Sequence, residues 1–440
     1  MSIEIISEYI KDGFAFFNGF WLLGNVYSFY PFIKHSKNEK KEEKHDDEPK
    51  ISVLVPAYKE ENVIIENVNR IEKTYYSKLE LILITEKDDF KTDRISEYLS
   101  KKYNNIKHVS LEGNKNRGKP RALNAGLKHA DGEIVGVLDS EDYIDRDLFK
   151  KVAYEFSRYD YDAIQGRLHL KESHDRWLDH QFAAEYKYWY DSYMNKLNKA
   201  GYILPFGGTT NFFKKSTLDE LNGWEDGNLT EDYELAIRMY KPKSGKKYKI
   251  GYIDTVTTEE TPKNIKSWIK QRTRWSQGKL DTTLEYIKKK DLDTKSKLKI
   301  LATGINSFIG TVNLIGVGIS AYMYASGTNM GYFAGLAYTN LCFVGAYCYL
   351  QGKAYYEILK EKGDKHRYLK SAFIGATTPI YWALQWAANT IALGREIKGK
   401  KNWEKTMHLQ CQHSLLLMLI SLQKLQVFPI LSPFHQLSYP

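Results

Sequence analysis

Residues 51–56 read ISVLVP, and residues 79–85 read LELILIT. Each stretch is a short apolar run with the length of a buried strand. Residues 60–73 lie between them and place apolar side chains at helical spacing. Helices and strands are expected to keep alternating at residues 92–103, 106–109, 119–130 and 133–138. This alternation predicts an α/β fold with a mostly parallel sheet and helices on both faces.

The composition excludes several classes of protein. The 440-residue chain has 42% hydrophobic and 27% charged residues, which excludes a disordered or collagen-like protein. Three cysteines exclude a disulfide scaffold. The formal net charge is +10, which suits an anionic membrane surface or an anionic substrate. Acidic and basic side chains are mixed rather than clustered on one face, so we do not expect nucleic-acid binding.

Three segments carry no charged side chain: residues 13–33, residues 300–352 and residues 371–394. A helix needs about 20 apolar residues to cross the hydrocarbon core of a bilayer. We therefore expect an N-terminal transmembrane helix within residues 1–34 and a transmembrane region of two or three spans over residues 300–394. A buried helix of a soluble domain is the alternative for any one of these segments.

The rest of the chain divides by composition. Residues 35–50 mix acidic and basic side chains, which predicts a solvated linker. Residues 51–290 hold the strand and helix pattern and end in an amphipathic helix that is expected at the membrane interface. The lysines that follow the first uncharged segment place residues 34–299 in the cytoplasm. Residues 395–440 form a tail to which we assign no role.

Four polar residues, Asp139-Ser140-Glu141-Asp142, follow the fourth expected strand. Parallel sheets place ligands beyond the carboxyl ends of their strands. Carboxylate oxygens suit a divalent cation that also holds a diphosphate, so Asp139 and Glu141 are candidate metal ligands. The alternative is structural, because Ser140 or Asp142 could cap a helix expected near residues 145–156.

Two further turns carry side chains of the kind that bind ligands. Residues 85–89, TEKDD, offer acceptors for a base or a ribose, or form a solvated turn. Residues 118–121, GKPR, open a helix whose N-terminus, together with Lys119 and Arg121, could receive phosphate oxygens. A basic surface turn explains the same residues equally well.

The segment Thr230-Glu231-Asp232 begins a helix that is expected over residues 231–240. Threonine at the N-cap and acids in the first turn stabilise any helix, and this capping interpretation is the simpler one. Asp232 could instead act as a general base toward an acceptor hydroxyl.

Gln271, Arg274 and Trp275 fall at i, i+3 and i+4 of a later helix and therefore share one of its faces. A guanidinium can bind a diphosphate through two hydrogen bonds, and an indole offers a flat apolar platform for a sugar ring. The alternative is an amphipathic helix that simply lies at the membrane interface.

The order of these motifs is more specific than any one of them. Between residues 51 and 290 the chain carries, in order, PAYKE, GKPRALNAGL, DSED, GGTTNFF, GWEDGNLTEDYELAIR and QRTRW. This order resembles the membrane-embedded family 2 glycosyltransferases, which include the cellulose, chitin and hyaluronan synthases. The resemblance implies a GT-A, Rossmann-like nucleotide-sugar-binding domain inserted between transmembrane helices. It also implies an integral protein of the plasma membrane whose catalytic domain lies in the cytoplasm.

The resemblance assigns roles to the residues at matching positions. Contacts with the nucleotide and diphosphate are implied for Ala57, Tyr58, Glu60, Glu86, Asp88, Lys119, Asp139, Gln271 and Arg274. Contacts with the acceptor are implied for Gly207, Gly208, Thr209, Glu231 and Trp275. Asp139 and Glu141 would hold Mg²⁺ or Mn²⁺, and Asp232 would be the general base.

The implied reaction is an inverting transfer of a sugar from a nucleotide sugar, with UDP as the expected nucleotide, to a growing polysaccharide. Transfer of one sugar to a lipid or lipid-linked acceptor is the alternative enzyme function. A catalytically silent glycan-binding or scaffolding membrane protein is the alternative from a different class. The expected partners are a nucleotide-sugar donor, a glycan or lipid-linked acceptor and the lipid bilayer. GDP in place of UDP stays open, because residues 85–89 lack the family's usual acidic pair.

Overall fold

The computed structural model describes residues 17–19, 21–26, 28–29, 48–113, 118–171, 175–240, 245–327 and 333–399. Most of the linker expected at residues 35–50 lies outside these ranges, as does nearly all of the tail expected at residues 395–440. The first uncharged segment, residues 13–33, is described only in part. The predictions for these three segments therefore stay predictions.

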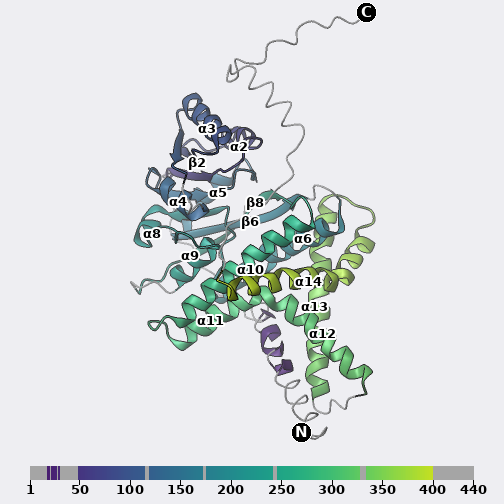
Figure 1. The fold of residues 1–440 in the computed structure, drawn as a ribbon. Coiled ribbons are helices and arrows are strands. Elements are labelled where there is room, and N and C mark those ends of the chain that lie inside the picture. The colour runs from purple at the N-terminus through teal and green to yellow at the C-terminus, as the bar shows by residue number, and fades with distance from the viewer. Residues whose placement is uncertain are drawn as a thin grey trace, which may run out of the picture.

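One mixed sheet organises the described part of the chain (Figure 1). Its eight strands lie in the order β3 (Ile106–Leu111), β2 (Leu79–Glu86), β1 (Ile51–Pro56), β4 (Ile134–Val137), β7 (Asn211–Lys214), β6 (Ala163–Lys171), β8 (Ile250–Glu260) and β5 (Tyr143–Ile144). β1 lies inside the sheet, between β2 and β4. This position explains its apolar sequence, because both faces of an inner strand are covered.

The prediction of a mostly parallel sheet is right for one half of the sheet and wrong for the other. β1 to β4 run parallel to one another. β7 runs antiparallel to β4 and to β6, and β5 runs antiparallel to β8. Only β6 and β8 are parallel in this second half of the described sheet. The connection from β6 to β7, residues 172–210, is long enough to return the chain in either direction, so alternation with helices does not set the direction of β7.

The helices expected beside the first strands are present, with ends that differ by a few residues. They are α2 (Ile64–Ile71), α3 (Phe90–Lys102), α4 (Lys119–Leu127), α5 (Leu148–Tyr159) and, later in the chain, α9 (Glu231–Tyr240). α5 begins directly after Asp147. Neither Ser140 nor Asp142 therefore caps it, and the capping interpretation of the acidic cluster is wrong.

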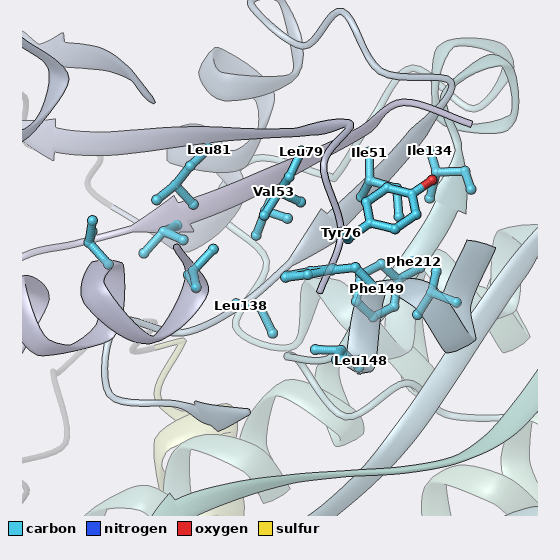
Figure 2. Packing of buried hydrophobic residues seen from close by; sticks show 14 of the residues in the cluster. Ile51, Val53, Tyr76, Leu79, Leu81, Ile134, Leu138, Leu148, Phe149 and Phe212 are labelled. Carbon is cyan, nitrogen blue, oxygen red and sulfur yellow. The ribbon is translucent and has the colours of Figure 1, made fainter. Parts of the chain in front are cut away.

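The sheet carries an apolar layer on each face because side chains alternate along its strands. Val53 packs with Leu81 and Phe149 in the layer that Figure 2 shows. Leu54 and Ile82 belong to the opposite layer, to which α4 contributes. All five side chains are fully buried. A sheet covered in this way leaves its strand ends, rather than its faces, for a ligand.

A second group of helical segments packs on the side of the sheet that holds β6 and β8 (Figure 1). The group comprises α6 (Trp177–Lys187), η1 (Tyr188–Tyr193), α7 (Met194–Ala200), α10 (Ile265–Lys288), α11 (Thr294–Ile305), η2 (Asn306–Phe308), α12 (Ile309–Ala325), α13 (Phe333–Glu361) and α14 (Arg367–Ile397). η1 is a π-helical turn, a geometry that is frequent at functional sites. α10 packs along α14, and α14 packs against α13. A short helix, α8 (Lys215–Glu220), follows β7.

Within the part of the chain that the structure describes, one helical run is long and apolar enough to cross a membrane. It extends from Thr294 to Ala325 and has a mean hydropathy of 1.6 in its most apolar window. This run, which comprises α11, η2 and α12, ends at Ala325, and α13 begins at Phe333, so residues 300–352 are divided between the run and α13. α14 contains the whole of residues 371–394. The number of membrane spans stays a prediction.

Replacing Gly136 with alanine is expected to destabilise the sheet. A Cβ at Gly136 on β4 would lie 2.6 Å from the ring of Phe212, which is fully buried on the neighbouring strand β7. The ring or the strand must shift, so we expect a loss of about 1–3 kcal/mol in the free energy of unfolding. Denaturant unfolding followed by circular dichroism measures this loss. Gly394→Ala is the control, because a Cβ there meets no atom within 4 Å; an equal loss in both variants would contradict the prediction.

Candidate active site

A cleft of about 430 Å³ opens beyond the carboxyl ends of β1, β2 and β4. Its wall there includes Ala57 after β1, Glu86 at the end of β2 and Asp139 after β4. Residues of α9 and α10 form a second wall, and residues of η1 and of α12 to α14 extend the cleft away from the sheet. The location follows the general rule for ligands of parallel sheets.

Most of the residues that the sequence singled out line this one cleft. They are Ala57, Tyr58, Glu60, Glu86, Lys119, Asp139, Glu141, Gly207, Gly208, Glu231, Asp232, Gln271, Arg274 and Trp275. Asp88, Arg121 and Thr209 are the exceptions. The turn after β2 leaves Asp88 exposed outside the cleft, and Thr209 is fully buried behind the cleft wall. The expected contacts of Asp88 with a nucleotide and of Thr209 with an acceptor therefore lack support from their positions.

Glu86 is held in place by Arg121, whose Nη1 donates to Glu86 Oε1 at 2.7 Å. Arg121 Nη2 also donates to the carbonyl of Glu112 at 2.8 Å. The guanidinium that was expected to receive phosphate oxygens is thus engaged with the wall formed by β2. In the same region Asp89 accepts a hydrogen bond from the backbone N–H of Lys59, which fixes the turn after β1 against the turn after β2.

Lys119 joins two segments that are far apart in the sequence. Its Nζ donates to Asp139 Oδ1 and, at 2.9 Å, to the carbonyl oxygen of Gly208. Burial by itself would lower the pKa of Lys119, but the carboxylates of Asp139 and Glu231 raise this pKa above its ordinary value. Lys119 is therefore a permanent positive charge in the wall of the cleft.

Asp142 stabilises the loop that presents Asp139. Its Oδ2 accepts hydrogen bonds from the backbone N–H of Asp139 at 2.8 Å and from Thr209 Oγ1 at 2.5 Å. The Asp142 side chain is fully buried. Burial, together with the charge of Asp139, raises the pKa of Asp142 well above its ordinary value. Asp142 and Thr209 thus have a structural position behind the site rather than a place in the cleft.

Asp139 and Glu141 fit the divalent metal that the sequence resemblance implies. Both side chains line the cleft, and carboxylate oxygen is the donor type that Mg²⁺ and Mn²⁺ prefer. In the described ranges, no three or more His, Cys, Asp and Glu side chains gather as a metal site. A cation that is shared with a diphosphate needs only one or two protein carboxylates, because phosphate and water supply the other ligands.

Glu231 and Asp232 begin α9 in the second wall of the cleft. Asp232 Oδ1 accepts a hydrogen bond from the backbone N–H of Tyr233 at 2.7 Å. Thr230 occupies the N-cap position, since its carbonyl accepts a hydrogen bond from the N–H of Glu234, but its Oγ1 is buried and has no hydrogen-bond partner among the described residues. The predicted cap by the Thr230 side chain is therefore wrong. Burial and the neighbouring charge of Asp232 raise the pKa of Glu231 to about 7. Burial also raises the pKa of Asp232.

Two glycines bring a loop close to Asp232. Gly208 has a φ of +81°, and a Cβ there would lie 3.3 Å from Asp232 Oδ2. A positive φ is adopted by glycine at little cost. The backbone N–H of Gly207 donates to Gln165 Oε1 at 2.8 Å, and a Cβ at Gly207 would collide with the hydroxyl of Tyr190. The absence of a side chain at Gly208 keeps the space beside Asp232 Oδ2 open, and its absence at Gly207 lets the loop pack against Tyr190.

Gln271, Arg274 and Trp275 face the cleft from α10. Arg274 Nη1 donates to the carbonyl of Leu229 at 3.3 Å. Arg274 Nε and Gln271 Oε1 are buried, and neither atom has a hydrogen-bond partner in the part of the chain that the structure describes. Buried polar atoms are normally paired, so both are available to a polar ligand. This face of α10 lies in the cleft, which argues against the interfacial interpretation of these three residues.

Further cleft residues carry no signal in the analysis of the sequence. Arg272 and Lys279 on α10, Glu185 on α6 and Glu259 on β8 all line the cleft. Burial and nearby carboxylates raise the pKa of Glu259 well above its ordinary value, and burial lowers the pKa of Lys279. Arg272 lies inside the motif QRTRW and could have been noticed there. The other three belong to segments without a motif.

The sequence profile described as "Glycosyltransferase like family 2" matches residues 49–278, which is more than half of the chain. The chain belongs to this glycosyltransferase family. The match begins just before β1 and ends within α10, after Trp275. It therefore contains all the described strands and both walls at the sheet end of the cleft.

Two relatives align with this family 2 glycosyltransferase over part of their lengths. "Probable glycosyltransferase YdaM" of Bacillus subtilis is 29% identical over 253 residues, which are 54% of this chain and 57% of that protein. The poly-beta-1,6-N-acetyl-D-glucosamine synthase of Staphylococcus aureus is 25% identical over 270 residues, which are 60% of this chain and 63% of the synthase. The chain thus spans about three fifths of the length of these relatives.

A solved structure shares the fold of this family 2 glycosyltransferase. It is the mannosyltransferase of Pyrobaculum calidifontis in complex with GDP-Man and Mn²⁺, which superimposes with a TM-score of 0.54 at 20% identity and covers 85% of this chain and 99% of that one. At this identity the likeness concerns the fold alone. The expected GT-A-like α/β fold is confirmed, while its insertion between transmembrane helices stays a proposal.

Replacing Glu231 with glutamine should make the stability of this family 2 glycosyltransferase less sensitive to pH. Folding raises the pKa of Glu231 from an ordinary value of 4.5 to about 7, so ionisation of Glu231 favours the unfolded chain. The wild-type protein should lose stability through this group as the pH rises across that interval, by at most about 3 kcal/mol. Glu231→Gln removes this loss.

Denaturant unfolding at about pH 4 and about pH 8 measures the difference, since these two values bracket the interval between 4.5 and about 7 in which the stability changes. The stability of Glu231→Gln relative to the wild type should be higher at the more alkaline pH. The exposed Glu97 is the control, because its hydrogen bond with Lys101 lowers its pKa and Glu97→Gln should show no such gain. The same relative stability of Glu231→Gln at both pH values would refute the prediction.

Proposed function

We propose that the chain is an inverting membrane glycosyltransferase that transfers a sugar from a UDP-sugar to a growing polysaccharide. The observation that carries the proposal is that Asp139, Asp232 and Arg274, from three separate segments, line one cleft. A metal-binding carboxylate, a carboxylate base and a guanidinium are groups suited to transfer from a nucleoside diphosphate sugar. Membership of family 2 supports this class of reaction.

The donor nucleotide would lie across the carboxyl ends of the parallel strands. Ala57, Tyr58, Glu60 and Glu86 line this end of the cleft and would contact the base and the ribose. Glu86 is well suited to orient a nucleoside because Arg121 Nη1 donates to its Oε1 at 2.7 Å and so fixes the carboxylate. Asp88 is left out of this proposal because it lies outside the cleft.

The charge of the leaving diphosphate would be balanced by several groups. Lys119 contributes a permanent positive charge beside Asp139. Arg274 Nε offers a buried N–H donor that has no partner in the described residues. Gln271 Oε1 is buried without such a partner too, but it can only accept a hydrogen bond and would contact a hydroxyl group of the ligand. Asp139 and Glu141 would hold Mg²⁺ or Mn²⁺, which when bound supplies further positive charge to the diphosphate.

Asp232 would act as the general base. The acceptor hydroxyl would give its proton to Asp232 as its oxygen bonds to the anomeric carbon and the bond from that carbon to the diphosphate oxygen breaks. Attack from the face opposite the leaving group inverts the anomeric carbon. Asp232 Oδ1 is engaged by the N–H of Tyr233, so Oδ2, which lies on the side of Gly208, would take the proton. Burial raises the pKa of Asp232 and makes it a stronger base than an exposed aspartate.

The acceptor would occupy the helical side of the cleft. Past Trp275 the lining includes the aromatic side chains of Tyr347, Tyr381 and Trp382, and aromatic faces offer apolar platforms to sugar rings. An aromatic tract that continues beyond the reacting position suits a glycan of several sugars. The residues proposed to contact the terminal acceptor sugar are Gly207, Gly208, Glu231 and Trp275.

Transfer of a single sugar to a lipid or lipid-linked acceptor is the second candidate function. The cleft reaches Ile309 and Gly310 at the start of α12, within the described helical run that is apolar enough to cross a membrane. A lipid-linked acceptor could approach from that side. In both candidates the chain would be an integral protein of the plasma membrane with residues 51–290 in the cytoplasm.

Incubation of membranes that contain the protein with labelled UDP-sugars and Mg²⁺ or Mn²⁺ tests the proposed function. We expect a labelled product that stays in the aqueous phase after organic extraction and lengthens with time. A single labelled sugar in the organic phase would support the second candidate instead. Transfer from GDP-sugars alone would overturn the UDP assignment, and no transfer from any nucleotide sugar would overturn the function.

Asp232→Asn is expected to lower kcat by roughly 100- to 10,000-fold, because an amide of the same size cannot accept the proton. The affinity for UDP should be nearly unchanged, since the base acts on the acceptor. Initial rates of transfer give kcat, and calorimetric titration with UDP gives Kd. Asp226→Asn is the matched control, because Asp226 is exposed and outside the cleft. A wild-type kcat for Asp232→Asn would rule out the base role.

Removal of divalent cations with a chelator is expected to weaken UDP binding, and Mg²⁺ or Mn²⁺ should restore it. Asp139→Asn should require at least about tenfold more cation for the same UDP affinity, because a ligand of the cation is lost. Calorimetric titration at increasing cation concentrations measures this requirement. Asp145→Asn is the control, an exposed carboxylate a few residues farther along the same segment. Equal cation requirements for both variants would remove Asp139 from the metal site.

A further inference from the structure

A partly buried ion pair joins α10 to α6 inside the cleft. Arg272 Nη1 and Nη2 donate to the two carboxylate oxygens of Glu185 at 2.8 and 2.5 Å. The two side chains are only 14% and 27% exposed, and both line the cleft. Burial would lower the pKa of Arg272, but the charge of Glu185 raises it. Arg272 is therefore a permanent positive charge, and the reaction described above uses neither member of the pair.

The guanidinium of Arg272 also lies among three aromatic rings. Its central carbon is 4.5 Å from the ring centre of Phe182, 5.3 Å from that of Trp268 and 5.2 Å from that of Trp275. A planar guanidinium can lie against aromatic rings while its N–H groups bind a carboxylate. Glu185 thus fixes the orientation of Arg272, and Arg272 restrains the indole of Trp275.

Helix α14 reaches the same carboxylate. The hydroxyl of Tyr381 donates to Glu185 Oε2, and Gln385 Nε2 donates to this oxygen at 3.4 Å. Arg272 Nη2 donates to the hydroxyl oxygen of Tyr381 at 3.2 Å. One carboxylate of α6 therefore connects the wall that carries Trp275 with the helix that extends the cleft.

Stability alone is a weak reason for this arrangement. The removal of two charges from water costs several kcal/mol, and replacement of a buried ion pair by apolar side chains is often neutral or stabilising. The bidentate geometry of the pair fixes the orientation of the side chains that surround it. That orientation matters most at Trp275, where a sugar ring would lie against the indole.

We infer that Arg272 and Glu185 are positioning residues that hold the indole of Trp275 and helix α14 in one geometry and so place the acceptor sugar relative to Asp232. The inference rests on the proposed transfer to an acceptor glycan. The pair would affect how the acceptor binds and how it is oriented. It would not affect donor binding, because other residues of the sheet and of α10 would hold the donor.

The double variant Arg272→Met/Glu185→Met tests the inference. Removal of both partners leaves no uncompensated buried charge, so we expect the fold to be kept. With a short oligosaccharide of the transferred sugar as acceptor, kcat/KM for the acceptor should fall roughly 10- to 100-fold, with the larger part of the change in KM. The affinity for UDP and the slow hydrolysis of UDP-sugar without acceptor should match the wild type.

Arg176→Met/Asp179→Met is the matched control. Arg176, which directly precedes α6, and Asp179 in its first turn also form a bidentate pair, with both N–O distances at 2.9 Å, but neither residue lines the cleft. The control should keep the wild-type KM for the acceptor. Arg272→Lys keeps the charge without the planar fork and should show a smaller change in the same direction. Thermal unfolding of each variant reports whether it is folded.

An unchanged acceptor KM in a folded double variant would overturn the inference. An equal loss of UDP affinity and acceptor affinity would also overturn it, because that pattern indicates a general structural role. If the double variant unfolds, the same two constants measured for Arg272→Lys decide between these outcomes. A wild-type protein that transfers no sugar from any nucleotide sugar would overturn the proposed function instead.

Discussion

The cleft depends on one contact between segments that are distant in the chain. The ammonium of Lys119, in the first turn of α4, binds the carboxylate of Asp139 after β4 and the carbonyl of Gly208 before β7. Asp142 and Thr209 connect the same two loops through a fully buried hydrogen bond of 2.5 Å. The loop after β4 holds three acids within residues 139–142, and like charges so close together repel one another. The partly buried cation and the shared hydrogen-bond network hold this loop in place against the loop before β7.

Burial of polar groups is the second constraint, and these groups lie in two places. Asp142 lies behind the cleft wall, where its Oδ2 accepts hydrogen bonds from its own loop and from Thr209 while its Oδ1 has no partner in the described ranges. Arg274 and Gln271 line the cleft itself, and each also keeps a buried polar atom that has no such partner. Perturbed carboxylates and unsatisfied polar atoms that share a cleft are typical of functional sites. The unpaired atoms of Arg274 and Gln271 therefore mark the part of the cleft wall where a polar ligand would bind.

The cleft does not end at the sheet. Its lining continues onto η1 and onto α12 to α14, and Glu185 binds both α10 and α14 at the point of transition. Under the proposed function, this continuity couples the donor end of the cleft to the acceptor end. The helix that carries Arg274 and Trp275 also carries Arg272, so the diphosphate end and the acceptor end are parts of one rigid element.

Local sequence patterns were sufficient to predict β1, β2 and α2, because apolar periodicity depends only on neighbouring residues. The motif order was sufficient to collect most of the cleft residues. The direction of β7 and the separate roles of Asp139 and Asp142 came from packing between distant segments. Arg272 and Arg274 are two residues apart, which turns their side chains about 200° from each other on a helix, yet only the folded chain shows that one meets a carboxylate of α6. The role of a residue such as Arg272 depends on its burial and on the charge of its partner. The order of residues along the chain does not reveal either property.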